Sequence, residues 1–361
     1  MDDQELRSIV ESATGAPSVH NTQPWRFVGR LAPDGTAWAL DVMADPSRQL
    51  KVIDPEQREL HVSCGAAIEL AVVALRGRGV GCTVDLLPTP GASDHLARVT
   101  IGPPEPPSPD DRLLLASLPA AYTERGPFDD RAVPESLRAH LRQEAARAGA
   151  WLLCLDRPGQ WVTAAVLLAR ADAVEQADPA YRQELARWVG LGGEPPGTPA
   201  GGTGRRRATT LRRRELEPPG EPASTGAGSE PPFAGHPLLV VIGTAEDDPL
   251  AWLQAGRALA RMMLRAAADG VSASPMTEVL ELPSTRAMLA RGLGLVGYPQ
   301  MVLEMGYARC RPAAARRPVD EVYLTSTCSA ASPAATGVPQ GGRRPRTAGA
   351  GRSASSTRPR G

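Results

Sequence analysis

Residues 16–27 read APSVHNTQPWRF. They lie between a predicted helix at 4–13 and a predicted strand at 25–31, so the segment is a loop that joins two regular elements. Such loops present polar groups from a rigid scaffold. Amide side chains both donate and accept hydrogen bonds, and Arg offers a planar fork of donors. The segment therefore predicts either a plain helix-ending turn or a site that recognises the edge of a flat heteroaromatic ligand.

The residues after this loop alternate between apolar and polar side chains. This alternation at 25–31 and 37–43, around a Pro-Asp-Gly turn at 33–35, predicts a β-hairpin. A long helix is expected over 55–78, and its middle is apolar almost all round, which implies deep burial. Further strands are expected at 81–87 and 96–101, before a proline-rich run at 102–109 that marks a boundary between units.

The second part of the chain repeats the same kinds of element. The pattern predicts helices at 134–148, 158–176, 179–189, 250–269 and 283–292, and strands at 151–155, 238–243, 300–305 and 319–324. In both parts a strand is followed by a long Ala-rich helix and another strand. This similarity fits two copies of one α+β unit packed as an internal dimer, and it equally fits a chance likeness of helix and strand patterns.

Composition excludes several classes of protein. The chain has 361 residues and no net charge, but its last 36 residues hold six Arg and no acid, so the remainder carries −6. An acidic body argues against a nucleic-acid partner. No apolar run approaches 18 residues, and the acidic N-terminus lacks the features of a signal peptide, so we expect a cytoplasmic protein without a membrane partner. Five scattered Cys form neither a disulfide framework nor a metal site.

The 16–27 loop resembles the flavin-contacting loop of the nitroreductase family, whose pattern is roughly A-P-S-x-x-N-x-Q-P-W-R-F. The matching residues are Ser18, Asn21, Gln23, Pro24, Trp25 and Arg26. The resemblance implies an α+β sandwich that binds FMN, normally at the interface of a homodimer. In that family one subunit supplies this loop, and the other supplies phosphate contacts from an R-x-[ST]-x-R motif and from an Arg near its end.

The partner motifs have their counterparts in the second part of this chain. Residues 122–128 (YTERGPF) resemble the opening phosphate segment, 275–278 (PMTE) the loop that approaches the flavin ring, and 316–322 (RRPVDEV) the closing Arg motif. The second part has no S-x-x-N-x-Q-P-W pattern. The chain thus resembles the single-chain Acg-type branch, which implies two fused nitroreductase-like halves, an internal pseudo-dimer and a monomer with one site.

The resemblance, together with the proline-rich run at 102–109 and the Gly/Pro-rich composition of 190–235 and of the last 36 residues, implies the following organisation and site. The first half covers 1–105, the second half covers 106–325 with a lid or insertion at 190–235, and 326–361 form a disordered basic tail. Because Ala121 stands where the family has Arg, the phosphate falls to Arg125, Arg316 or Arg317. We expect Arg26 near the N1–O2 edge of the flavin, Asn21 and Gln23 at its pyrimidine edge, and backbone donors of 277 or 278 near N5. The full set of expected FMN-binding residues is Ser18, His20, Asn21, Gln23, Arg26, Thr123, Arg125, Met276, Thr277, Glu278, Arg316 and Arg317.

Two functions follow from this resemblance. The first is two-electron reduction of nitroaromatic or quinone-type small molecules with NAD(P)H, by ping-pong hydride transfer. No catalytic side chain is expected, because the flavin carries the hydride chemistry. The alternative is a non-catalytic protein that stores FMN under a lid formed by 190–235.

Overall fold

The computed structural model describes residues 1–31, 38–124, 128–188, 237–308 and 315–326. The described residues all belong to one compact unit, Met1–Cys328. Arg125, the turn at 33–35 and the insertion at 190–235 lie outside them, as does the tail beyond Ser326.

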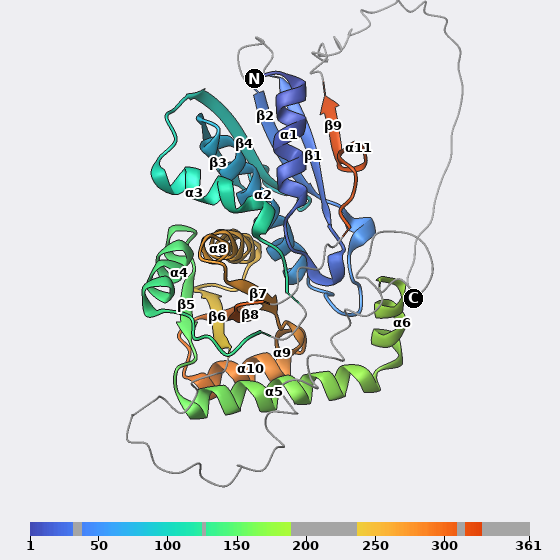
Figure 1. The fold of residues 1–361 in the computed structure, drawn as a ribbon. Helices are drawn as coiled ribbons and strands as arrows, with labels where there is room; N and C mark the ends of the chain where they lie inside the picture. Colours follow the sequence, from blue (N-terminus) through green and yellow to red (C-terminus); the bar gives the residue numbers. More distant parts are fainter. Residues whose placement is uncertain (32–37, 125–127, 189–236, 309–314, 327–361) are drawn as a thin grey trace, which may run out of the picture. The chain divides into compact units, whose positions relative to one another are not determined.

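The first sheet combines strands from the two ends of the chain. Its five strands run in the order β3-β4-β2-β1-β9 (Figure 1). Neighbouring strands are antiparallel except β9, which lies parallel to β1. The strands are β1 (Trp25–Leu31), β2 (Trp38–Ala44), β3 (Val80–Leu86), β4 (His95–Pro104) and β9 (Tyr323–Ser326).

The second sheet has four antiparallel strands in the order β5-β6-β8-β7. Every residue of the central strand β6 is buried, as its unbroken apolar run predicts. The strands are β5 (Trp151–Cys154), β6 (Leu238–Thr244), β7 (Ser272–Pro275) and β8 (Tyr298–Gly306). Two largely antiparallel sheets packed with helices make an α+β fold, which confirms the predicted class.

The helices begin and end at recognisable signals. A reciprocal capping box of Asp2 and Glu5 starts the first helix, and Ser108 and Asp111 start another in the same way. The α-helices are α1 (Asp3–Thr14), α2 (Arg58–Gly77), α3 (Pro109–Ser117), α4 (Glu135–Arg147), α5 (Pro158–Ala177), α6 (Pro179–Trp188), α8 (Pro249–Ala268), α9 (Glu278–Glu281), α10 (Pro283–Leu293) and α11 (Val319–Val322). Short 3₁₀ turns are η1 (Val19–Asn21), η2 (Pro46–Arg48) and η3 (Leu118–Ala120).

Helix α2 is buried along almost its whole length, as its apolar composition predicts. With a mean hydropathy of 1.4 it is the one helix among the described residues that is long and apolar enough to cross a membrane. Its sequence still has no uninterrupted apolar run of that length, because polar residues such as His61 and Glu69 interrupt it. Because 89% of its apolar window is buried inside the protein, α2 has the character of a core helix.

Helices α2 and α8 cross with their backbones in contact. A Cβ atom on Gly65 would overlap the carbonyl oxygen of Leu253, and one on Gly256 would overlap that of Val62. Beside this crossing, the buried carboxylate of Glu69 on α2 accepts hydrogen bonds from Arg257 and Arg261 of α8, at 2.7 and 2.8 Å. The close backbone contact at the two glycines and the hydrogen bonds of Glu69 together hold α2 against α8.

One predicted strand was wrong in its bounds, and some elements were not predicted. Residues 319–322, expected to be extended, form α11, and the strand begins only at Tyr323. Pro318 precedes the turn as its N-cap, with φ −55° and ψ 146°, and the acidic residues 320 and 321 in the first turn favour a helix. The unpredicted elements include α3, β7 and α9, which have only nine, four and four residues.

We expect Gly256→Ala to lower the free energy of unfolding by at least about 1–3 kcal/mol, because the added methyl forces two backbones apart. Gly159→Ala is the matched control, since a Cβ at this helical glycine meets no atom within 4 Å. It should leave stability unchanged or raise it by up to about 1 kcal/mol, because Ala is the better helix former. Urea unfolding of both variants measures the difference, and equal midpoints would contradict the crossing described here.

Candidate functional site

The loop between α1 and β1 has an unusual backbone. His20, Asn21 and Gln23 all adopt positive φ angles, of 46°, 57° and 48°. Such angles are uncommon outside glycine and cost free energy, so surrounding contacts must hold them. Within the loop, Ser18 Oγ accepts a hydrogen bond from the Gln23 amide at 3.0 Å. The predicted residues of this loop are thus fixed in a compact turn.

The side-chain amides of the loop bind the segment that precedes β9. Asn21 Nδ2 donates to the Ala315 carbonyl at 2.9 Å, and Asn21 Oδ1 accepts from Arg316 at 2.6 Å. Gln23 Oε1 accepts from the Arg317 backbone amide at 2.8 Å. Asn21 and Gln23 are only 2% and 0% exposed, so these bonds are shielded from water. The loop and the closing arginine motif therefore form one structural unit, although about 295 residues separate them.

Arg316 is a partly buried cation without a carboxylate partner. Its guanidinium donates to Asn21 Oδ1 and, at 3.1 Å, to the Gly15 carbonyl, and no ion pair forms with it among the described residues. Burial lowers its pKa from the usual range of arginine. Such a group is suited to receive an anion.

Two further arginines lie at the same loop. Arg317 donates to the carbonyls of Gln23 and Trp25 and lies 3.7 Å from Asp45 and 3.6 Å from Glu321. Arg48 donates to the Thr22 carbonyl, and burial followed by the nearby charge of Arg317 lowers its pKa. Its buried Nη2 has no hydrogen-bond partner among the described residues. We call Arg48, Arg316 and Arg317 the arginine cluster.

Sequence reasoning missed Arg48, because it lies in a segment with no recognisable motif. It also did not predict the ion pair of Arg26. The Arg26 guanidinium lies 2.9 Å from buried Asp45, and its side chain is 48% exposed. Burial opposes ionisation of Asp45, but its hydrogen bonds to Ser47 and Arg26 lower its pKa overall.

The remaining predicted residues gather at β7. Thr123 forms a parallel bridge with Ala273, while Met276 is buried where the chain leaves β7 for α9. Thr277 Oγ1 donates to Glu281 at 2.8 Å, and Glu278 begins α9. The structure therefore brings Thr123 beside the strand that leads into the 276–278 loop. Arg125 lies outside the described residues.

Helix α6 has contacts near the two groups of predicted residues, those of the 16–27 loop and those that follow β7. Its Glu184 accepts hydrogen bonds from the backbone amides of Lys51, Val52 and Ile53, at 2.7, 2.9 and 2.9 Å. Its last residue, Trp188, lies 5.1 Å below the Arg48 guanidinium. Tyr181 on the same helix interacts with Glu175 of α5, which packs against α9. None of these α6 contacts was predicted, because each is tertiary.

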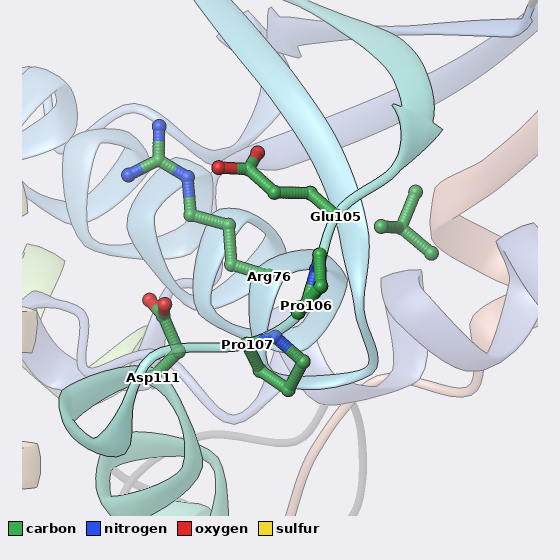
Figure 2. A pocket seen from close by; sticks show the side chains of 6 residues that line it. Arg76, Glu105, Pro106, Pro107 and Asp111 are labelled. Carbon is green, nitrogen blue, oxygen red and sulfur yellow. The ribbon is translucent and has the colours of Figure 1, made fainter.

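Two pockets among the described residues lie beside the C-terminal half of α2. One, of about 230 Å³, is lined by Arg76, Val80, Glu105, Pro106, Pro107 and Asp111 (Figure 2). A neighbouring one shares Arg76 and Asp111 and extends to Arg257 and Arg261. None of the predicted flavin-binding residues lines either pocket.

The family model and two of the curated relatives that match this chain carry the same family name. A model described as "Nitroreductase family" matches residues 121–307. A Mycobacterium tuberculosis protein named "Putative NAD(P)H nitroreductase Rv3131" is 35% identical over 323 residues, covering 85% of this chain and 86% of that protein. "Putative NAD(P)H nitroreductase acg" of the same organism is 27% identical over 88% of this chain and 95% of its own length. The crystal structure of the FMN-dependent nitroreductase NfnB from Mycobacterium smegmatis with NADPH is 16% identical, with a TM-score of 0.37 over 60% of this chain and 98% of that one.

We expect Asn21→Ala to lower the free energy of unfolding by about 1–3 kcal/mol, because it leaves the Ala315 carbonyl and one Arg316 donor unpaired. Gln49→Ala is the control, since its hydrogen bonds to Asp54 and Pro55 are 3.5 and 3.4 Å long and lie nearer to solvent. Its loss should stay below about 0.5 kcal/mol. Denaturant titration compares the two, and an Asn21 variant as stable as the control would show that the amide does not hold the 315–317 segment.

Proposed function

This chain belongs to the nitroreductase family of FMN-dependent NAD(P)H oxidoreductases, and we propose that it reduces nitroaromatic or quinone-type small molecules two electrons at a time. FMN, when bound, supplies the hydride acceptor and donor of the reaction. The chain's own residues bind and orient it and shape the space in which NAD(P)H and the acceptor would alternate. We place this activity in the cytoplasm.

The observation that carries the proposal is the arginine cluster. Arg316 is desolvated without a carboxylate, and Arg48 has a buried donor that no described residue satisfies. Buried cations in this state are costly, and a phosphate dianion would offset that cost through charge-assisted hydrogen bonds. The donor set thus fits the phosphate of FMN, with Arg316 and Arg317 as its ligands and Arg125 as a further one.

The other expected contacts remain part of the same proposal. Ser18, His20, Asn21, Gln23 and Arg26 would face FMN from the first half, and Thr123, Met276, Thr277 and Glu278 from the second. Asn21 and Gln23 have a second role, since their amides already hold the 315–317 segment. Arg26 would then favour the reduced, anionic flavin with a charge that Asp45 partly neutralises.

We further propose that residues 1–105 and 106–325 are two nitroreductase-like halves that form an internal pseudo-dimer. The contact of α2 with α8 and the pairing of β9 with β1 support this view, because both join segments of different halves. A chain that carries both halves has no need of a second copy to complete the site. The expected state is a monomer that binds one FMN.

A storage role is the second candidate, and the contacts of α6 favour it. Glu184 and Trp188 fasten this helix to the 48–53 segment beside the loop. A cover attached in this way would limit the access of NAD(P)H to the ring. The lid predicted at 190–235 follows α6 in the chain and lies outside the described residues.

The visible absorption spectrum of the purified full chain, repeated after addition of NADPH without oxygen, tests the function. We expect bound oxidised flavin whose absorbance bleaches with NADPH and returns when a quinone is added. Sedimentation with flavin quantitation should give a monomer with one FMN. Flavin that stays oxidised with NADPH would favour storage, and colourless protein that binds no added FMN would contradict both candidates.

We expect Arg316→Ala to weaken FMN about 10- to 150-fold, since a charge-assisted hydrogen bond contributes about 1.5–3 kcal/mol and ~1.4 kcal/mol is tenfold. Riboflavin has no phosphate and should be affected far less. Arg125→Ala should show the same selectivity, while Asn21→Ala should weaken both ligands alike. Arg142→Ala, which removes an exposed partner of Glu135, is the control. Fluorescence titration in which Arg316→Ala weakens both ligands equally would contradict the phosphate assignment.

A further inference from the structure

Two buried carboxyl groups face each other where α5 packs against α9. Glu175 of α5 is 3% exposed, and Glu281 ends α9. The two carboxyl groups are close enough to affect each other's pKa, and Glu175 Oε1 and Glu281 Oε2 are buried atoms that accept no hydrogen bond from a conventional donor among the described residues. Two ionised carboxylates have no proton to donate to each other, so this pair requires a shared one.

One shared proton satisfies the whole network. With the proton on Glu281, its Oε2 hydroxyl can donate to Glu175 Oε1, and Thr277 Oγ1 donates to Glu281 Oε1 at 2.8 Å. Tyr181 of α6 interacts with Glu175 from the other side through its hydroxyl. The result is a continuous polar chain from α6 through α5 and α9 to the 276–278 loop.

The surroundings favour this protonated form. Glu278 of α9, Asp172 of α5 and Glu59 of α2 are the other acids that act on the pair. Of the nearby cations, Arg58 pairs with Glu59 and Arg286 pairs with Asp247. Burial and then the charge of Glu278 raise the pKa of Glu175 to about 8. Burial and then Glu175 raise the pKa of Glu281, and burial together with adjacent carboxylates raises that of Tyr181. No described cation neutralises the pair directly.

We propose that Glu175 and Glu281 are positioning residues that share one proton and so hold the Met276–Glu278 loop against α5. This rests on the function proposed above, because that loop is the one expected at the flavin ring. Removal of the proton leaves two carboxylates side by side in a desolvated place, where their repulsion is strong. Helix α9 then separates from α5, and the Thr277 hydroxyl loses its fixed acceptor.

The sign of the pH dependence follows from this arrangement. A carboxyl group that titrates near 8 in the folded chain and near 4.5 in the unfolded chain keeps an extra proton in the folded state between these values. Stability is therefore greatest at the acidic end of this window and falls as the pH rises through it. For one proton, the unfolding equilibrium constant increases up to about tenfold per pH unit.

The test compares the unfolding of the full chain without added flavin from pH 6 to 9 in four proteins. The free energy of unfolding of wild type should fall as the pH rises. Glu175→Gln keeps a donor toward Glu281 but has no titrating proton, so its free energy of unfolding should depend far less on pH. Glu281→Gln gives the same comparison should the first variant fail to fold. Asp269→Asn, which removes an exposed acid at the end of α8, should keep the wild-type pH dependence. Burial raises the pKa of Glu59 to about 7, so this group also titrates within the pH range of the test. The readout is therefore the difference in pH dependence of the unfolding free energy between wild type and the Gln variants.

A second measurement links the pair to the loop. FMN affinity of wild type should fall at least about tenfold between pH 7 and 9, and that of Glu175→Gln should stay nearly constant. If the free energy of unfolding depends on pH equally in wild type and in both Gln variants, the shared proton is overturned, whether or not FMN binds. A chelator that abolishes the wild-type slope would also overturn it, in favour of a bound cation. If the slopes differ as expected but no FMN binds, the shared proton stands and the proposed function fails.

Discussion

Helices α2 and α8 cross at Gly65 and Gly256, where each glycine lies against a backbone carbonyl of the other helix. No side chain fits between them, so the separation of the two helices is set by backbone atoms alone. Glu69 then binds Arg257 and Arg261 across the same interface. A buried carboxylate with two guanidinium partners adds little net stability, but it penalises any shift that would break its contacts. The position of the second sheet relative to the first depends on this crossing.

The candidate site depends on the same placement, because it joins residues from both ends of the chain. The strand β9 lies parallel to β1, and the residues before it meet Asn21 and Gln23. Left-handed conformations at non-glycine residues cost about 1–3 kcal/mol each, and the loop contains three of them. The hydrogen bonds to Ala315, Arg316 and Arg317 help offset that cost. The shape of the loop is therefore a tertiary property, although its residues form a continuous motif.

The parts of the molecule that sequence could predict are those fixed by local pattern. The hairpin strands, the buried helix at 58–77 and the long helices followed from periodicity, and the 16–27 motif led to the correct family. Arg48, Glu184 and Glu175 were missed because their importance comes from partners distant in sequence. Arg48 meets Thr22 and Trp188, and Glu184 meets three amides more than 130 residues away. Residues 319–322 show the opposite error, since a local helix-start signal outweighed an apparent strand pattern.

Helix α6 connects the two charged parts of the site. Its Trp188 lies under Arg48 of the arginine cluster, and its Tyr181 interacts with Glu175 of the carboxyl pair. Tyr181, Leu185 and Trp188 of α6 pack into a small apolar cluster with Leu50 and Ile53, and this helix is held in addition by polar contacts such as those of Glu184. Such contacts respond to charge in a way that an apolar core does not, because their strength depends on whether each group is ionised. An anion at the arginine cluster and a proton at the carboxyl pair would thus both act on the position of α6, which gives cofactor binding and pH a common structural element.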